Sequence, residues 1–77
     1  MKIEILGTGC PKCEQLASNA KQAVDELGIV GEIVKVTDIV EITERGVMMT
    51  PALSVDGDIK MSGKLATVAE LKTLLAG

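Results

Sequence analysis

The two cysteines of the chain lie in one short stretch, GTGCPKC, which spans residues 7–13. Cys10 and Cys13 are separated by a proline and a lysine, Pro11 and Lys12. Sulfurs at this spacing can form a dithiol–disulfide couple, supply two ligands of a metal site, or be two small apolar side chains without chemistry. The spacing alone does not decide among these three, so the surrounding sequence has to.

Composition removes several kinds of cysteine site. A structural zinc site normally has four Cys or His ligands, whereas this chain has two Cys and no His. Two cysteines also cannot build the multi-bridge framework of a small secreted domain. Redox chemistry, a soft two-thiolate metal site and inert burial remain.

Charge and hydropathy exclude further classes of partner. The chain has 77 residues and a formal net charge of −3, with no basic cluster and no aromatic residue on which bases could stack, so we expect no nucleic-acid partner. No apolar run is long enough to cross a membrane. A strand pattern begins at Lys2 and leaves no room for a signal peptide. We therefore expect one cytoplasmic domain over residues 1–77, without a membrane partner and acting as a monomer.

The apolar pattern places the cysteines between a strand and a helix. The first strand runs from Lys2 to Leu6 and is ended by Gly7-Thr8-Gly9. Pro11 suits the first turn of the helix that follows, and Gly28 stands where its C-terminal cap belongs. One face of this helix carries the apolar residues Leu16, Ala17, Ala20, Ala23, Val24 and Leu27.

The rest of the chain predicts three more strands and two more helices. Asp38 caps a short helix, Asp56-Gly57-Asp58 is a hairpin turn, and Thr67-Val68-Ala69-Glu70 is a capping box. The predicted strands are residues 32–36, 52–55 and 59–62, and the predicted helices are residues 39–45 and 67–75. The order is β-α-β-α-β-β-α. A right-handed crossover makes the first two strands parallel, and the hairpin completes a four-stranded mixed sheet in an α/β fold.

This order gives the two cysteines different surroundings. Cys13 lies on the apolar face of the first helix and should be shielded, whereas Cys10 lies at the helix N-terminus and should be accessible. Unpaired N–H groups, the helix dipole and the charge of Lys12 all favour a thiolate at Cys10. Cys10 can therefore attack a substrate disulfide, and Cys13 can resolve the mixed disulfide that forms. The alternative without chemistry is a pair of small buried residues.

At this point the sequence resembles a known family. CPKC after a first strand, Thr50-Pro51 before a hairpin and a closing helix are similar to a thioredoxin-fold protein of glutaredoxin size. The whole chain resembles the small thioredoxin-like redox-active disulfide proteins of archaea and anaerobic bacteria. The resemblance implies a thiol–disulfide oxidoreductase that serves cell redox homeostasis and electron transport.

The resemblance also implies site residues. Cys10 is the nucleophile, Cys13 is the resolving thiol, and Pro51 is a cis-proline beside them. The Thr50 backbone pairs with the substrate chain as an added strand, and Pro11 and Lys12 complete the expected substrate contacts. No cofactor is expected beyond the Cys10–Cys13 disulfide, and the expected partners are disulfides of other proteins and a reductase that supplies electrons.

Several positions depart from the family pattern. Gly9 replaces the usual aromatic residue before the first cysteine, and Lys12 replaces the glutaredoxin tyrosine. The glutathione-binding residues of glutaredoxins have no clear counterparts, so a protein partner is preferred. Glu4 stands six residues before Cys10, the spacing of a buried acid in many thioredoxins. It could accept a proton from Cys13, but a solvated glutamate at the strand end is the commoner outcome.

Two methionines, Met48 and Met49, precede Thr50 and could form an adaptable apolar rim for partner proteins. We expect one of them to be buried and the other to lie at the surface.

Two other functions compete with redox catalysis. Small copper chaperones also carry CxxC between a first strand and a helix, and Cu(I) favours two thiolates. Those domains usually have Met two residues before the first cysteine, where this chain has Thr8, and they end in a strand rather than a helix. An interaction module could instead use the groove at Pro51 without turnover.

Overall fold

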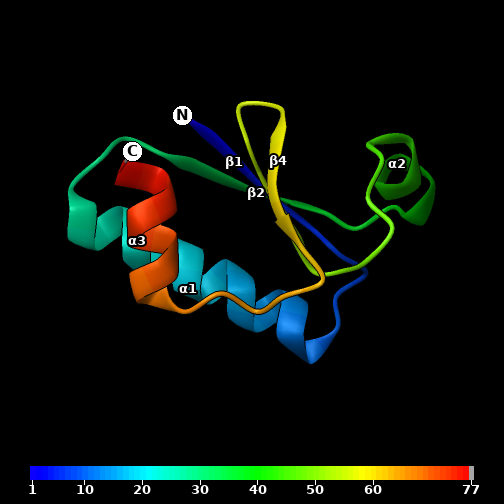
Figure 1. Ribbon diagram of the computed structural model, residues 1–77, viewed down its shortest axis with the longest axis horizontal. Coiled ribbons are helices and arrows are strands. Elements are labelled where there is room, and N and C mark those ends of the chain that lie inside the picture. The colour runs from blue at the N-terminus through cyan, green and yellow to red at the C-terminus, as the bar shows by residue number, and fades with distance from the viewer. Residues whose placement is uncertain (77) are drawn as a thin grey trace.

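The computed structural model describes residues 1–76 and contains a four-stranded sheet with three helices (Figure 1). The elements in chain order are β1 (Lys2–Leu6), α1 (Pro11–Leu27), β2 (Glu32–Val36), α2 (Ile39–Glu44), β3 (Ala52–Val55), β4 (Asp58–Ser62) and α3 (Val68–Ala76). The predicted order of strands and helices is confirmed. The prediction of a single domain over residues 1–77 stays a prediction, and Gly77 lies outside the described residues.

The sheet is mixed, with β1 and β3 in its interior. The strand order is β2-β1-β3-β4, and β1 pairs parallel with β2 and antiparallel with β3. β3 and β4 form an antiparallel hairpin, whose turn residues Asp56 and Gly57 both have positive φ, 50° and 92°. Two successive positive φ values are those of the tight hairpin turn that an Asp-Gly pair favours. β4 consequently begins at Asp58, one residue earlier than the sequence predicts.

Helix α1 begins and ends at the residues that local signals indicate. Pro11 occupies the first turn, Cys10 is the N-cap residue with extended backbone, and Gly28 closes the helix in the left-handed conformation with φ 66°. A residue without a side chain adopts that conformation at little cost. The same rules apply to the shorter helices: Asp38 caps α2 through its side chain, and Thr67 and Glu70 form the predicted capping box of α3.

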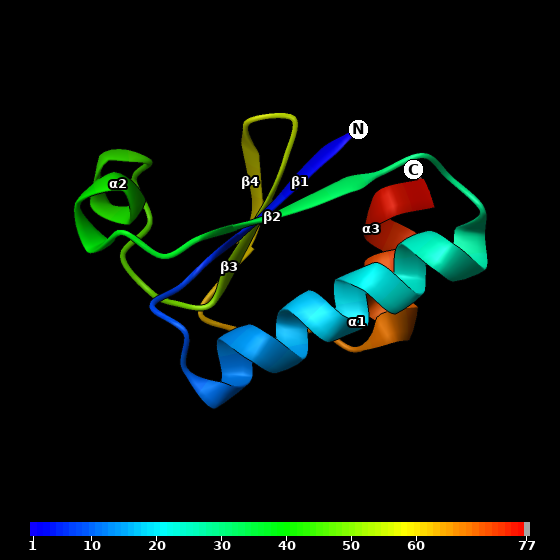
Figure 2. The same ribbon diagram turned by 180° about the vertical axis from the view of Figure 1, so that it is seen from behind.

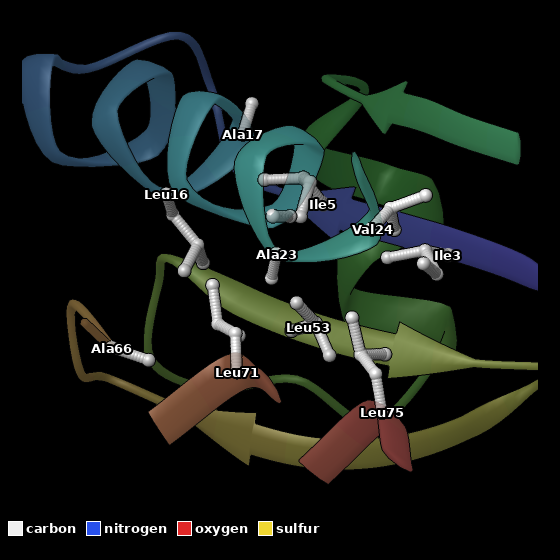
Figure 3. Close-up of a cluster of buried hydrophobic side chains, with 11 residues drawn as sticks. Ile3, Ile5, Leu16, Ala17, Ala23, Val24, Leu53, Ala66, Leu71 and Leu75 are labelled. Atoms are coloured by element: carbon white, nitrogen blue, oxygen red, sulfur yellow. The ribbon is translucent and has the colours of Figure 1, made fainter. Parts of the chain in front are cut away.

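The main hydrophobic core lies between the sheet and the pair of helices α1 and α3 (Figure 3). Ile3 and Ile5 of β1 and Leu53 of β3 point toward Leu16 of α1 and Leu71 of α3, and all five side chains are fully buried or nearly so. Because side chains alternate along a strand, the neighbours of Ile3, Ile5 and Leu53 face the other side of the sheet.

A second, smaller cluster joins α2 to that other side. It contains Leu6, Val36, Ile42, Val47 and Ala52, so it lies where β1 and β2 end and β3 begins. Both ribbon views place α2 apart from α1 and α3, at the opposite end of the molecule from the C-terminus (Figure 1, Figure 2). Within residues 1–76, no helix has both the length and the apolar content needed to cross a membrane.

Candidate active site

Cys10 lies where α1 begins, and its sulfur takes the place of a capping oxygen. The backbone N–H of Cys13 donates a hydrogen bond to Cys10 Sγ over 3.3 Å. This is the bond that Ser, Thr, Asp or Asn makes at most helix N-termini. The Cys10 side chain is half-buried and lies against the unpaired N–H groups of the first turn, which is the environment that the sequence predicts.

Cys13 is the shielded partner. Its side chain is only 4 % exposed and belongs to the buried face of α1. The sulfurs of Cys10 and Cys13 are 2.6 Å apart, with both residues as free cysteines. The two sulfurs can therefore reach one another without any movement of the backbone.

The pKa values of the two thiols are shifted in opposite directions. Hydrogen bonding with the Cys13 thiol, and next with the Cys13 backbone N–H, holds the pKa of Cys10 below the ordinary value for cysteine. Burial, and next the hydrogen bond to Cys10, raises the pKa of Cys13. Lys12 contributes through its backbone N–H, whereas the sequence interpretation relied on its side-chain charge. Cys10 is thus the stronger candidate for a thiolate at neutral pH.

Gly7 has a function that the sequence analysis did not find. A Cβ atom at this position would lie 2.2 Å from Cys13 Sγ and 3.9 Å from the Cα of Pro51. Gly7 therefore stands between the resolving cysteine and the Thr50–Pro51 segment, and any side chain there would collide with the sulfur. In the sequence Gly7 is recognisable only as the residue that ends the strand, because its closeness to Cys13 is a tertiary contact.

The Thr50–Pro51 segment lies beside the cysteines, just before β3. The peptide bond between the two residues is cis. Pro51 is buried, and its carbonyl accepts a hydrogen bond of 2.9 Å from the N–H of Gly63, whereas Thr50 is exposed. Pro11 and Lys12, in the first turn of α1, are exposed as well. The predicted substrate-binding residues thus include three accessible positions and one buried proline.

Comparison with known proteins identifies the family of the chain. The sequence profile of the thioredoxin domain matches residues 1–76. The chain is 45 % identical over 76 residues to a thioredoxin of Methanothermobacter thermautotrophicus, with 99 % of each chain covered. It is also 54 % identical over 70 residues to a thioredoxin of Methanocaldococcus jannaschii, which covers 91 % of this chain and 80 % of that one. The chain belongs to the thioredoxin family. It is a small thioredoxin-like thiol–disulfide oxidoreductase of archaeal type, as the sequence predicts.

Glu4, at the position of the buried acid of many thioredoxins, differs from both sequence interpretations. It is not a solvated glutamate, because only 4 % of it is exposed. Arg45 donates two hydrogen bonds of 2.8 Å to its carboxylate, and Ser54 lies within 3.5 Å. Glu4 alternates with Ile3 and Ile5 and therefore faces α2, on the side of the sheet opposite to α1 and Cys13. This placement turns Glu4 away from Cys13, so it does not support the possibility, raised from the sequence, that Glu4 accepts a proton from Cys13.

The expectation for the two methionines is half wrong. Met48 is 95 % exposed and Met49 is 64 % exposed, so neither is buried. Met49 packs against Gly63, where an added Cβ would approach its side chain to 3.0 Å. Two exposed methionines therefore precede Thr50 in the chain.

Two hollows differ in their relation to the cysteines. The larger, of about 400 Å³, lies between β4 and α3, and none of its lining residues is a cysteine. A cavity of about 10 Å³ lies directly beside Cys13. Among residues 1–76, no group of three or more His, Cys, Asp or Glu side chains gathers as a metal site would require. The small cavity is the one that bears on the thioredoxin chemistry.

Proposed function

We propose that the protein reduces disulfides in other proteins with the Cys10–Cys13 couple of its Cys-Pro-Lys-Cys motif. The single observation that carries this proposal is the asymmetry of the pair. The Cys10 sulfur is partly exposed and accepts a helix N–H, and it touches a Cys13 sulfur that is buried. Thiol–disulfide exchange needs one accessible sulfur to attack and one shielded sulfur to resolve.

The steps follow from the positions of the two sulfurs. The Cys10 thiolate attacks a substrate disulfide, forming a mixed disulfide and releasing one substrate thiolate. Cys13 then attacks Cys10 Sγ, which breaks the mixed disulfide and releases the second substrate thiolate. The substrate gains two electrons and Cys10 and Cys13 lose them, so a reductase must return two electrons before the next turnover. No cofactor besides the Cys10–Cys13 disulfide takes part.

The substrate binds where the accessible residues gather around Cys10. Thr50 lies at the entrance to β3, so its backbone pairs with an extended segment of the substrate, while buried Pro51 fixes the segment beside Cys13. Pro11 and Lys12 border the same sulfur from the first turn of α1. The protein works as a cytoplasmic monomer. An ordinary protein disulfide suits this open site better than glutathione, since the basic residue and Gly-Gly segment of glutaredoxins have no counterparts here.

The soft-metal alternative differs from the redox function in the last element of the fold. It predicts a closing strand, whereas α3 forms the end of the described chain. An interaction module without turnover would differ in a second way, because its binding would not depend on Cys10.

The test uses insulin as the disulfide substrate and dithiothreitol as the electron source. We expect the wild-type protein to reduce insulin and Cys10→Ser to be inactive. Cys13→Ser should instead accumulate a mixed disulfide between Cys10 and the insulin chain, which mass spectrometry detects after acid quenching. A Cys10→Ser variant as active as wild type, or a Cys13→Ser variant that forms no adduct, would contradict the proposed function.

A further inference from the structure

The small cavity beside Cys13 connects that buried thiol with charged groups at the surface. It is lined by Cys13, Glu14, Lys35 and Thr37, together with Ile5, Gly7 and Gly9. Its volume of about 10 Å³ corresponds to roughly one water molecule, and a bound water needs two or more polar partners. Among the lining residues, Cys13, Thr37 and Glu14 carry polar groups of this kind, a thiol, a hydroxyl and a carboxylate.

Glu14 and Lys35 reach from the cavity to solvent. Lys35 Nζ and Glu14 Oε2 are 2.6 Å apart, and both side chains are about half exposed. Glu14 directly follows Cys13 on α1, and Lys35 lies on β2 opposite Ile5 of β1. The ion pair therefore joins α1 to β2 next to the resolving cysteine, and both of its residues line the cavity.

Resolution of a mixed disulfide requires Cys13 to lose its proton. Burial makes that loss costly, and at neutral pH a proton acceptor near the sulfur offsets part of the cost. The titratable and charged groups around Cys13 are Cys10 at the N-cap of α1, Lys12 and Glu14 of α1, and Lys35 of β2. In the mixed disulfide the Cys10 sulfur is bonded to the substrate sulfur, so Cys10 cannot act as the proton acceptor. The two lysines are cations and cannot accept a proton either. Glu4 of β1 faces the other side of the sheet and is held by Arg45. Glu14 is the carboxylate that remains.

We propose that Glu14 accepts the proton of Cys13 through a single water molecule in this cavity when Cys13 resolves the mixed disulfide. The inference rests on the proposed function. The Cys13 thiol gives its proton to the water as the water gives one of its own to the Glu14 carboxylate. The freed sulfur lone pair attacks Cys10 Sγ, and the bond between Cys10 and the substrate sulfur breaks. The substrate leaves as a thiolate that is protonated by solvent, and Glu14 returns its proton to solvent.

A symmetrical nitrobenzoate disulfide, whose released thiolate is coloured, separates the two chemical steps in a stopped-flow experiment. The first coloured phase reports attack by Cys10, and the second reports resolution by Cys13. At neutral pH, we expect Glu14→Gln to slow the second phase by about tenfold, below the roughly 10²–10⁴-fold effect of an enclosed general base because the site is half open. The first phase should stay within about twofold of wild type.

The pH profile and a matched control distinguish proton transfer from a structural effect. Toward alkaline pH the second-phase rates of wild type and Glu14→Gln should converge, because hydroxide then removes the Cys13 proton. Glu14→Asp should restore part of the rate. Glu26→Gln is the control: it removes an exposed carboxylate at the other end of α1, paired with Lys72 over 3.1 Å, and should resolve like wild type.

Three results would overturn the proposal. They are an unchanged second phase in Glu14→Gln, an equal slowing of both phases, and an equal slowing in Glu26→Gln. A wild-type protein that releases only one coloured thiolate per molecule, rather than two, would instead refute the redox function itself, and the proposal with it.

Discussion

Because Gly7 has no side chain, the start of α1 can approach the end of β1 closely. Cys13 Sγ occupies the space in which a Cβ of residue 7 would lie. The same contact brings Pro51 near, so one glycine determines the spacing among the resolving sulfur, the strand end and the loop before β3. The site therefore depends on the lack of a side chain at residue 7 as much as on the two sulfurs.

Gly7→Ala tests this close approach. The added methyl group must displace Cys13 Sγ or separate α1 from β1, because a contact of 2.2 Å is not tolerated. We expect disulfide exchange to fall by about tenfold to 10²-fold, the effect of misplacing a reacting atom by about 1 Å. The melting temperature should also fall, since overfilling a core costs about 1–3 kcal/mol.

The matched control for Gly7→Ala is Gly31→Ala, and insulin reduction and thermal unfolding are the measurements. Gly31 also lacks a positive φ, and the atoms nearest to a Cβ there belong to the Val24 and Ile3 side chains, at 3.3–3.4 Å. Exchange by Gly31→Ala should stay near wild type. Equal losses in the two alanine variants would mean that the cysteine contact is not what Gly7 provides.

The short helix α2 is attached to the sheet by one ion pair as well as by its apolar side. Arg45 is the C-cap residue of α2. It donates two hydrogen bonds of 2.8 Å to Glu4 on β1 and a third of 3.1 Å to Glu41. Beyond Arg45 the chain passes through the two exposed methionines to Thr50 and Pro51. The acid that many thioredoxins use near the cysteines is thus used here to hold the element that leads into the substrate segment.

Glu4→Gln tests this attachment through the pH dependence of stability. The hydrogen bonds from Arg45 hold the pKa of Glu4 below its ordinary value, more than offsetting the effect of burial. The resulting stability is present above the unfolded pKa of about 4.3 and is lost as the pH falls through the lower folded pKa. We expect Glu4→Gln to melt about 5–10 °C below wild type at pH near 7, and this difference should shrink in acid below pH of about 4.

Glu41→Gln is the control for the Glu4 experiment, because it removes an exposed partner of the same arginine. Exposed pairs within a helix contribute little, so its melting temperature should lie within about 2–3 °C of wild type. Circular dichroism melts between acid and neutral pH give the comparison. A Glu4→Gln difference that is the same at every pH would show that the charge of Glu4 does not stabilise the fold.

Across the whole molecule, the cysteines lie at the end of the sheet where β1 and β2 terminate. That edge collects the N-terminus of α1, Gly7 and the residues before β3 in one place, although they are separated widely along the chain. In α/β sheets with parallel strands, sites form at the carboxyl ends of the strands for this reason. The main core beneath α1 and α3 supports the site from one side, and α2 supports it from the other.

The features that the sequence predicts are those with local causes. Pro11, Gly28, Asp56-Gly57 and the capping box at Thr67 each act within a few residues, so the element boundaries were correct to about one residue. The pairing of Glu4 with Arg45 spans 41 positions, and no local pattern indicates it. The exposure of Met48 and the contact between Gly7 and Cys13 likewise depend on how distant segments meet, so neither is visible before the fold is known.

Leu71 and Leu74 on α3 test how much of the stability resides in the main core. Leu71 is fully buried in the main core (Figure 3). Leu74, about one turn further along α3, is 36 % exposed. A domain of this size has about 4–11 kcal/mol of stability, and truncating a buried leucine costs about 2–5 kcal/mol. We expect Leu71→Ala to lose about half of the free energy of unfolding in a urea titration, and Leu74→Ala to lose less than about 1.5 kcal/mol.

Because the cysteines lie on α1 and not on α3, the fraction of Leu71→Ala that stays folded should reduce insulin at the wild-type rate. A folded Leu71→Ala protein with slow exchange would show that α3 acts on the active site through α1, and equal destabilisation by the two variants would contradict the core described between α3 and the sheet.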